Sequence, residues 1–589
     1  MPVPSYQVNF VAADGVTTYD VSQYVRSVTI DRGRSRELDK FEAGSFAVEF
    51  DNRLRYFDPQ YTDSTTRTNL VKNPVPSTSA PVSPQETWQM LNRGTGGAGT
   101  TTLTANGAVD TVTTAASTVV YSFGVTGGTT AARIQVTAGL TYAFSMYVTS
   151  SVNDVRRLAA TFYDTGGTSL GDVAVGVGQT LTAGVETRLV GTYTAPAGAV
   201  SVRMYGGNTT GSIIRPLNST MTWRYAMVEQ ASTVGTYFSG NTTDTNYQIY
   251  SWSGTAEAST STFVQYANPY YGLIIPNLGV QILSEGYGRI WGFVKDWNLS
   301  YDISGDSTAS ATGVDAFSFL AQQQTISALT PAQQTAGNRI GYVLSQPEVT
   351  WPYGGPEWTL DVTNTDEVQS HTIAAGTNIL EYVQLVERTE KGFFFLDNGG
   401  TIQFQARGYE LLSDVVFTDD GSDIAYQGIN IVYGTELLYN QVTFERLGGT
   451  ASVTEKNLES IALYGNSAFA DSGLLYVDDA SMISAALMYV AKYGEPEYRF
   501  ESVTVMLNPL TNTQINRVLS LDICSIVQVK FQPNGVGTRI SKYARIIGVT
   551  EEMNVDSYMI TFKLATLDNE AFTLDSDVTG LLDYNLLGY

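Results

Sequence analysis

The residues that could perform catalysis in this chain are few. His371 is the only histidine among 589 residues, which excludes a multi-histidine zinc site and leaves any Ser-His or Cys-His nucleophile with one candidate base. The stretch 368–372 around it is polar, which favours a surface histidine without a catalytic role. The single cysteine, Cys524, excludes an intrachain disulfide. Its apolar neighbours in 521–529 predict a strand with a buried, inert thiol.

Carboxylates are the remaining candidate catalysts. A glycosidase needs only two Asp or Glu side chains across the bond it cleaves, and the chain has 57 of them, so the sequence singles out no pair. Residues 419–423 read Asp-Asp-Gly-Ser-Asp. They lack the spacing and final Glu of an EF-hand loop, so a solvated turn is favoured over a cation site. We therefore assign no catalytic residue, no cofactor and no metal, and expect the chain not to be an enzyme.

The composition indicates a β-rich protein that does not hold nucleic acid. The formal net charge is −24, whereas static binding of DNA needs clustered Lys and Arg; a polyanion can still slide past such a surface. Only 15% of residues are charged, and 55 Gly and 36 Tyr suit strands joined by tight turns. No apolar run approaches the roughly 18 residues of a spanning helix, and residues 1–10 do not resemble a leader peptide. We expect a soluble protein without a signal peptide.

A composition break divides the chain. Residues 69–262 are rich in Thr, Ser and Gly and poor in charge, whereas the flanks read as one interrupted domain. Short strands such as 142–148 recur there without helical periodicity, which predicts an inserted antiparallel β-sandwich. Sugar-binding sandwiches stack sugar rings on exposed Trp or Tyr, but core packing explains most aromatic residues here, so the glycan-binding residues stay unassigned. These aromatic residues are Trp88, Tyr142, Tyr147, Tyr163, Tyr205, Trp223, Tyr225 and Tyr237.

Helical signals appear beyond residue 304. Thr330 and Pro331 are typical of an N-cap and a first helical residue. Asn378 can cap a second helix, with Glu381 reaching back to it, and that helix should end near Gly392. Residues 393–406 then predict a β-hairpin.

One further helix interrupts the strands of the last region. Asp478 or Asp479 can cap a helix over 481–493. Apolar residues recur in it at helical spacing and predict its buried stripe. The stripe consists of Ile483, Ala486, Leu487 and Val490.

Scattered stretches of the flanks carry a family resemblance. Residues 24–44, which include Asp-Arg-Gly-Arg-Ser-Arg-Glu-Leu-Asp, and residues 50–59, Phe-Asp-Asn-Arg-Leu-Arg-Tyr-Phe-Asp-Pro, resemble the start of minor tail proteins of siphophages that infect actinobacteria. Gly-Phe-Val-Lys-Asp-Trp at 292–297 is similar to a later segment of that family. So is the stretch 486–496 with the strand that follows from Phe500.

The resemblance implies a tail-hub protein of the baseplate, at the tail tip of the virion, made and assembled in the host cytoplasm. It implies a homotrimer whose two β-barrel domains per chain give a pseudo-sixfold ring matching the hexameric tail tube. The implied partners are the tail tube, the distal tail protein, the tape measure and other tail-tip proteins, and DNA would pass through an acidic lumen without specific binding. Two alternatives stay open: a hexameric distal tail protein with a similar N-terminal barrel, and a tail-borne cell-wall glycosidase.

The insert carries a second resemblance. Asn-Leu-Val-Lys-Asn-Pro at 69–74 and the stretches 226–230 and 235–240 are similar to the edges of carbohydrate-binding jelly-roll modules. This resemblance implies contact with glycans of the host envelope. It marks the edges of the fold and not a binding site, so no sugar-binding residue is carried over.

Together these observations predict a mainly β chain of the α+β class. The expected parts are a first hub β-barrel domain (1–68 plus 263–304), an inserted carbohydrate-binding-like β-sandwich (69–262), a mixed helix and hairpin domain (305–414), a second hub β-barrel domain with one helix (415–570), and a C-terminal tail (571–589).

Overall fold

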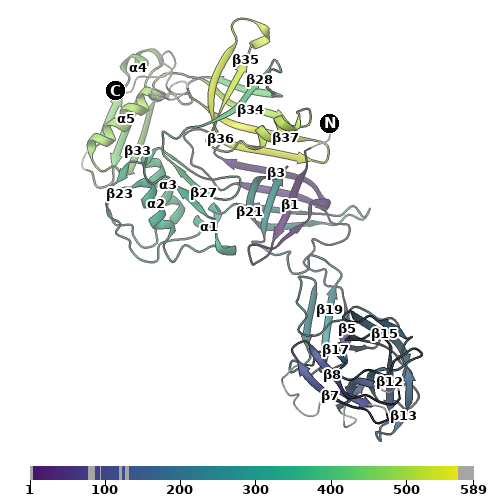
Figure 1. Cartoon of the computed structure of the whole chain (residues 1–589). Helices are drawn as coiled ribbons and strands as arrows, with labels where there is room; N and C mark the ends of the chain where they lie inside the picture. The colour runs from purple at the N-terminus through teal and green to yellow at the C-terminus, as the bar shows by residue number, and fades with distance from the viewer. Residues whose placement is uncertain are drawn as a thin grey trace. The chain divides into compact units, whose positions relative to one another are not determined.

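Figure 1 shows the computed structural model of the chain, which describes residues 4–76, 87–92, 95–118, 122–126, 132–449 and 452–567. The chain folds into two compact units: unit 1 is Met1–Asp58 with Leu273–Tyr589, and unit 2 is Pro59–Gly272. The boundaries expected for the insert, 69 and 262, lie at the end of β5 (Ser64–Asn69) and within β19 (Ser261–Tyr266). The expected tail 571–589 lies outside the described residues.

A sheet of 14 strands forms the centre of unit 1. Its path runs β2-β1-β20-β21-β22-β4-β3-β36-β35-β28-β29, and β37, β34 and β30 continue from β36. Phe46, Val48 and Phe50 of one strand are all buried, as the period of two predicts. The strands are β1 (Tyr6–Val11), β2 (Thr18–Asp20), β3 (Val25–Gly33), β4 (Ser45–Asp51), β20 (Gly279–Ser284), β21 (Tyr287–Ser300), β22 (Thr308–Val314), β28 (Leu411–Thr418), β29 (Ile424–Ala425), β30 (Gly428–Tyr433), β34 (Tyr498–Met506), β35 (Ser525–Phe531), β36 (Ile540–Asn554) and β37 (Tyr558–Thr566).

Strand β36 joins the two regions expected to form separate barrels. Its first half pairs with β35 and its second half with β3, while β37 pairs along its other edge. A Cβ at Gly33 would lie 2.4 Å from the carbonyl oxygen of Ile547, so only glycine fits where β3 meets β36. Strand pairing among the described residues closes no barrel, and the strands form one continuous sheet instead. The mainly β class is confirmed.

Helices and short strands of the region 305–414 pack beside this sheet. Asn378 accepts a hydrogen bond from the backbone N–H of Glu381 at 3.0 Å, so the predicted cap and the predicted hairpin of β26 and β27 are confirmed. The predicted start at Thr330 is wrong, because residues 334–335 pair with 367–368 as strands before the helix begins. The elements are α1 (Phe317–Leu320), β23 (Gln334–Thr335), α2 (Ala336–Leu344), β24 (Trp358–Leu360), β25 (Glu367–Val368), α3 (Ile379–Glu390), β26 (Phe393–Leu396) and β27 (Ile402–Gln405).

The region 415–567 contains more helix than expected: the single predicted helix is α5, and α4 and α6 accompany it. Asp478 caps α5 through a 2.8 Å hydrogen bond from the N–H of Ser481. The predicted stripe is wrong in part, because Ile483 and Leu487 are exposed while Met482 and Ala485 are buried with Ala486 and Val490. The remaining elements are β31 (Gln441–Arg446), β32 (Ser452–Lys456), α4 (Leu458–Tyr464), β33 (Ala468–Leu474), α5 (Asp479–Tyr493) and α6 (Asn512–Leu519), with short 3-10 turns at Ser22–Tyr24, Pro352–Gly354 and Pro533–Gly535.

Unit 2 is a β-sandwich, as predicted. A sheet ordered β15-β11-β17-β8-β7 packs against one ordered β13-β12-β16-β9-β6, around a core that includes Phe144, Phe162 and Trp223. A small sheet, β18-β19-β5, adjoins them. The further strands are β6 (Thr87–Asn92), β7 (Ala98–Thr104), β8 (Gly107–Thr114), β9 (Ser122–Thr126), β10 (Ile134–Gln135), β11 (Thr141–Ser150), β12 (Asp154–Tyr163), β13 (Ser169–Ala174), β14 (Gln179–Leu181), β15 (Glu186–Thr194), β16 (Ser201–Gly207), β17 (Thr220–Glu229) and β18 (Gln248–Trp252).

Candidate functional site

His371, the one candidate base, is half-buried beside two side chains of unit 1, whereas the sequence favoured a surface position. Its Nδ1 lies 3.3 Å from Nη1 of Arg339, and its Nε2 lies 3.2 Å from the hydroxyl oxygen of Tyr382. Burial lowers the pKa of His371 below its usual value, with a smaller effect of the neighbouring guanidinium. This arrangement holds a neutral imidazole in a hydrogen-bonded packing role.

The other two candidates for chemistry are Cys524 and the loop 419–423, and the contacts of both indicate a structural role. Cys524 is buried, and burial raises the pKa of its thiol to about 12, which makes it inert as predicted. It precedes β35, whereas the sequence placed it inside a strand. In the loop 419–423, Asp419 and Asp420 form ion pairs with Arg539, and arginine thus occupies the carboxylates that a cation would need. Among the described residues, no group of three or more His, Cys, Asp or Glu could hold a metal ion.

A buried ion pair stabilises the large sheet near β36, the strand that joins the first and last regions of unit 1. Arg289 of β21 and Glu551 of β36 are both fully buried, with Nη2 and Oε1 2.7 Å apart. Arg289 also donates to the carbonyl oxygen of Leu519 at 2.7 Å, and the hydroxyl of Tyr558 donates to Glu551 at 2.6 Å. Because each charge has several partners, the pair joins the strands on both sides of β36 without an isolated buried charge.

Burial and the charge of Glu551 together set the pKa values of Arg289 and Tyr558. Burial alone would lower the pKa of Arg289, but the carboxylate of Glu551 outweighs that effect and raises it. Burial and the same carboxylate raise the pKa of Tyr558 well above its usual value. The guanidinium and the phenol therefore stay protonated across the physiological range.

A second ion pair connects the same sheet to the hairpin of the middle region. Arg32 of β3 donates to Asp522 at 2.7 Å, and the backbone N–H of Asn398 donates to the other carboxylate oxygen at 2.7 Å. Arg32 is buried. The first, middle and last regions of unit 1 are thus fastened to one another through β3, the β26–β27 turn and the loop before β35. Neither ion pair could be predicted, because their partners lie hundreds of residues apart.

Glu387 of α3 gives unit 1 a measurable pH dependence. Burial raises the pKa of Glu387 to about 7, although its Oε1 accepts a hydrogen bond from the N–H of Phe394 at 3.2 Å. Between its ordinary pKa and about 7, the folded protein holds a proton that the unfolded chain releases. The contribution of Glu387 to stability is therefore fully present at low pH and is lost as the pH rises to 7.

We expect Glu387→Gln to remove this dependence. Relative to wild type, the free energy of unfolding of the variant should rise by up to about 3 kcal/mol between pH 5 and pH 7.5. Calorimetry of the unfolding transition of unit 1 measures this difference. Glu381→Gln removes an exposed carboxylate from the same helix and should follow the wild-type profile. A constant difference between Glu387→Gln and wild type over this range would show that Glu387 does not titrate there.

The eight aromatic residues of unit 2 that the sequence singled out divide into two groups. Three of them, Tyr147, Tyr225 and Tyr237, are half-buried and form a cluster with ring centroids 5.0 to 6.4 Å apart. The guanidinium of Arg224 lies 4.7 Å from the ring centroid of Tyr225. The others pack in or against the sandwich and are buried: Trp88, Tyr142, Tyr163, Tyr205 and Trp223.

A polar groove of about 780 Å³ lies between β5, β10 and the end of β17. Arg67 and Glu229 are fixed in it by two parallel hydrogen bonds, each 2.8 Å long. The side chains of Gln135 and Gln230 add amide groups, and threonines add hydroxyls. The phenol oxygen of Tyr142 accepts a hydrogen bond from the N–H of Thr137 at 2.8 Å, with its ring in the core. Such groups suit hydroxyl-rich ligands.

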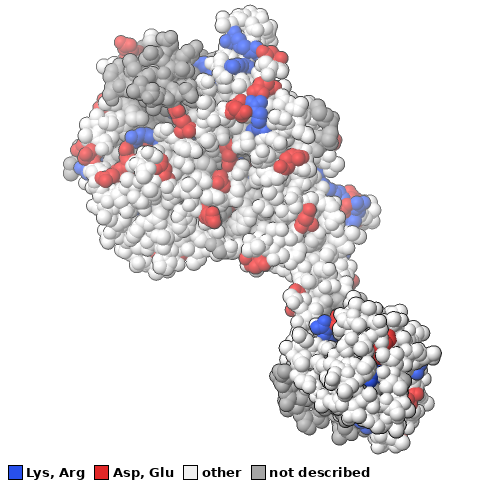
Figure 2. Space-filling view, viewed as in Figure 1, with Lys and Arg blue, Asp and Glu red and all other residues white. Residues whose placement is uncertain are grey.

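Charge is distributed differently over the two units. On the face seen in Figure 2, acidic side chains are spread over unit 1, while the surface of unit 2 is mostly uncharged. Within the part of the chain that the structure describes, each helix is too short or too polar to cross a bilayer.

In comparisons with known proteins, no family model and no curated protein matches this chain. Several solved structures do align with it. A tail protein from Neisseria meningitidis MC58 aligns with a TM-score of 0.38 and 13% identity, over 52% of this chain and 86% of that one. The 43 kDa tail protein of prophage MuSo2 from Shewanella oneidensis aligns with a TM-score of 0.37 and 15% identity, over 50% and 81% of the two chains.

Carbohydrate-binding modules align with a smaller share of the chain. The CBM22-1 xylan-binding domain of Xyn10C from Paenibacillus barcinonensis aligns with a TM-score of 0.19 and 13% identity, over 29% of this chain and 97% of that domain. The chain is thus similar to phage tail proteins and to carbohydrate-binding modules.

Proposed function

We propose that this chain is a structural tail protein of a long-tailed bacteriophage and forms the hub ring at the tail tip as a homotrimer. The observation that carries the proposal is the buried ion pair of Arg289 and Glu551, which links β21 and β36, strands from the first and last regions of unit 1 within one sheet. A trimer offers six similar contacts to a hexameric tube if each chain contributes two, one from the first and one from the last region of unit 1. These two regions must then keep a fixed position relative to each other. The resemblance of residues 24–44 and 50–59 to siphophage minor tail proteins points to the same role.

The proposed subunit contact lies on the outer side of α5. Ile483 and Leu487 are spaced one helical turn apart and are 38% and 44% exposed. Leu458 and Leu463 of α4 are 71% and 76% exposed. Exposed apolar residues one helical turn apart, such as Ile483 and Leu487, favour contact with another protein, and a second copy of this chain is the partner that a ring requires.

In this role the ring joins the tail tube to the tip complex and contacts the distal tail protein and the tape measure. The net charge of −24 supports the passage of DNA, because an acidic lumen repels the phosphate backbone and lets it slide. The proposed function includes no catalytic step. Release of reducing sugar from host envelope material by the purified chain would contradict this part of the proposal.

Unit 2 is proposed to contact glycans of the host envelope through its polar groove. The groove offers amides, hydroxyls and the fixed Arg67–Glu229 pair, which are groups that hydrogen-bond sugar hydroxyls. The half-buried tyrosine cluster stays a second candidate surface for stacking.

We expect Gln135→Ala combined with Gln230→Ala to weaken binding of the full chain to host cell-wall glycans about thirtyfold, since two lost hydrogen bonds at about 1 kcal/mol each cost about 2 kcal/mol. Binding is measured by pull-down on purified cell walls and by glycan array. Gln179→Ala on β14, outside the groove, is the control and should bind as wild type does. Unchanged binding in the double variant would move the glycan site elsewhere, and a blank array would leave unit 2 as a spacer.

A further inference from the structure

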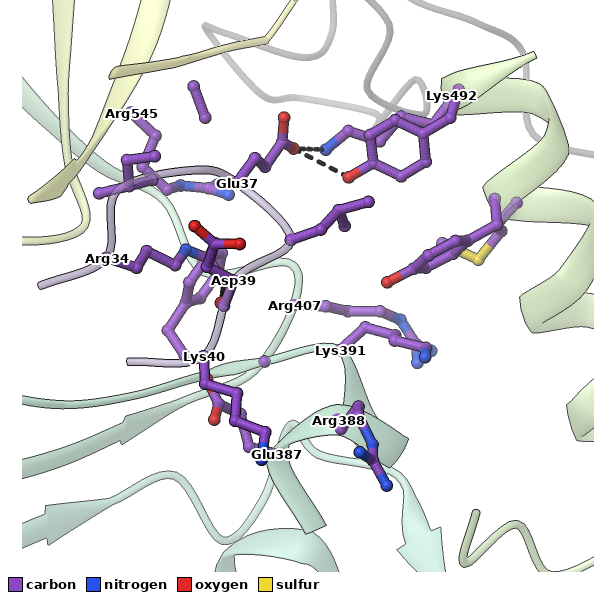
Figure 3. Close-up of a pocket in the computed structure, with 18 of the residues that line it drawn as sticks. Arg34, Glu37, Asp39, Lys40, Glu387, Arg388, Lys391, Arg407, Lys492 and Arg545 are labelled. Carbon is purple, nitrogen blue, oxygen red and sulfur yellow. Dashed lines mark hydrogen bonds and ion pairs between the residues drawn. The ribbon is translucent and has the colours of Figure 1, made fainter. Parts of the chain in front are cut away.

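A small, strongly basic cavity lies in unit 1 where the loop 34–40 meets α3, α5 and β36 (Figure 3). Its volume is about 170 Å³. Seven Lys and Arg side chains line it against three Asp and Glu side chains, although the whole chain carries a net charge of −24. Such a concentration of positive charge favours an anionic ligand.

Three of these cations have donors without partners. Nε of Arg34, Nε of Arg545 and Nζ of Lys391 are buried and make no hydrogen bond to the described residues. Arg545 is only 6% exposed, and its guanidinium lies 4.7 Å from the ring centroid of Phe393. The ammonium of Lys391 lies 3.7 Å from a carboxylate oxygen of Asp471, too far for a hydrogen bond. Unpaired buried donors are costly, so this cavity is built for an acceptor.

Two of the three acidic side chains that line the cavity, Glu37 and Glu387, are already engaged. Glu37 accepts from the ammonium of Lys492 at 2.6 Å and from the hydroxyl of Tyr493 at 3.0 Å. The dashed lines in Figure 3 mark these two contacts. The carboxyl of Glu387 accepts from a backbone N–H. Among the described residues, neither acid forms an ion pair with Arg34 or Arg545, and the ion pair of Glu37 is with Lys492.

The chain itself supplies a suitable anion at the cavity. Ala565 and Leu567 line its wall, and Leu567 is the last described residue before the segment 568–589. That segment contains no Lys, Arg or His. Its acidic residues are Asp568, Glu570, Asp575, Asp577 and Asp583.

We propose that the basic cavity binds the acidic segment 568–589 of its own chain, with carboxylates on Arg34, Arg545 and Lys391. Met488 and Tyr489 line the same cavity and add apolar surface to it. Binding adds negative charge to a cavity that seven Lys and Arg side chains line. Passing DNA then finds no cationic pocket to hold its phosphates.

The test compares the full chain with a chain that ends at Leu567, using a labelled synthetic peptide of residues 568–589 and fluorescence anisotropy. The shortened chain should bind the peptide, and the full chain should bind it at least about tenfold more weakly, because its own segment fills the cavity. Arg34→Gln with Arg545→Gln in the shortened chain should weaken binding about tenfold or more. Arg26→Gln, which removes an arginine outside the cavity, should leave binding unchanged.

A peptide with Asn and Gln in place of its Asp and Glu residues should not bind. Equal binding of the acidic peptide by the full and shortened chains, or equal binding of both peptides, would overturn the proposal. If the shortened chain does not fold, the full chain with those five acids changed to their amides replaces it and should take up the acidic peptide. Failure of that folded variant to bind would also overturn the proposal.

Discussion

We expect Glu551→Gln to destabilise unit 1 by about 3 to 5 kcal/mol, the cost of removing one partner from a buried ion pair. The variant leaves the guanidinium of Arg289 fully buried without a counter-charge and weakens the acceptor for the hydroxyl of Tyr558. Calorimetry should show a lower transition for unit 1, while the transition of unit 2 stays in place. The two transitions are read separately because a chain of two units does not unfold in one step.

Two further variants sharpen this result. Glu552→Gln alters the next residue of β36, whose side chain is exposed, and should change stability by less than about 0.5 kcal/mol. Arg289→Met combined with Glu551→Leu removes both charges. This double variant should be more stable than Glu551→Gln, because it leaves no buried charge without a counter-charge. Equal stability of Glu551→Gln and Glu552→Gln would show that the ion pair does not stabilise the large sheet.

The second large effect is expected at the proposed subunit contact. Leu487→Lys places a charge on the apolar side of α5 and should convert the proposed trimer to monomers, because burying an unpaired ammonium costs several kcal/mol. Light scattering with size-exclusion chromatography gives the mass of the particle at several concentrations. The fold should survive, since Leu487 is 44% exposed within one chain.

Thr513→Lys on α6 is the matched control, as it adds the same charge at an exposed position of unit 1. It should keep the wild-type mass. A Leu487→Lys protein with unchanged mass would exclude this side of α5 as the subunit contact.

Local signals in the sequence predicted local structure well. Asn378 and Asp478 cap helices where the capping patterns placed them, and the hairpin after Gly392 follows from its turn residues. The β-sandwich of the insert follows from recurring short strands, and Cys524 is buried as its neighbours indicated. In each case the determining interactions lie within a few residues of one another.

The failures have physical reasons. Helix α5 is apolar on most sides, so helical spacing alone could not tell the buried residues Met482 and Ala485 from the exposed Ile483 and Leu487. The N-cap pattern at Thr330 was overridden by strand pairing of residues 334–335. The sharing of β36 between β3 and β35 depends on contacts across the whole chain, which no local pattern encodes.

The same holds for the candidate sites. No motif marks the polar groove, because Arg67 and Glu229 meet only after the sandwich closes. The basic cavity draws Arg34, Lys391 and Arg545 from three distant regions. In the sequence, Arg34 drew attention only as part of the stretch 24–44 that carries the family resemblance.

The central claim is that copies of this chain form a threefold ring at the tail tip. Single-particle reconstruction of tail tips from purified virions that carry this chain tests it most directly. We predict three copies around the tube axis, with α5 at the contact between neighbours. Sixfold symmetry would indicate the distal tail protein instead, and absence of the chain from purified tails would contradict the account.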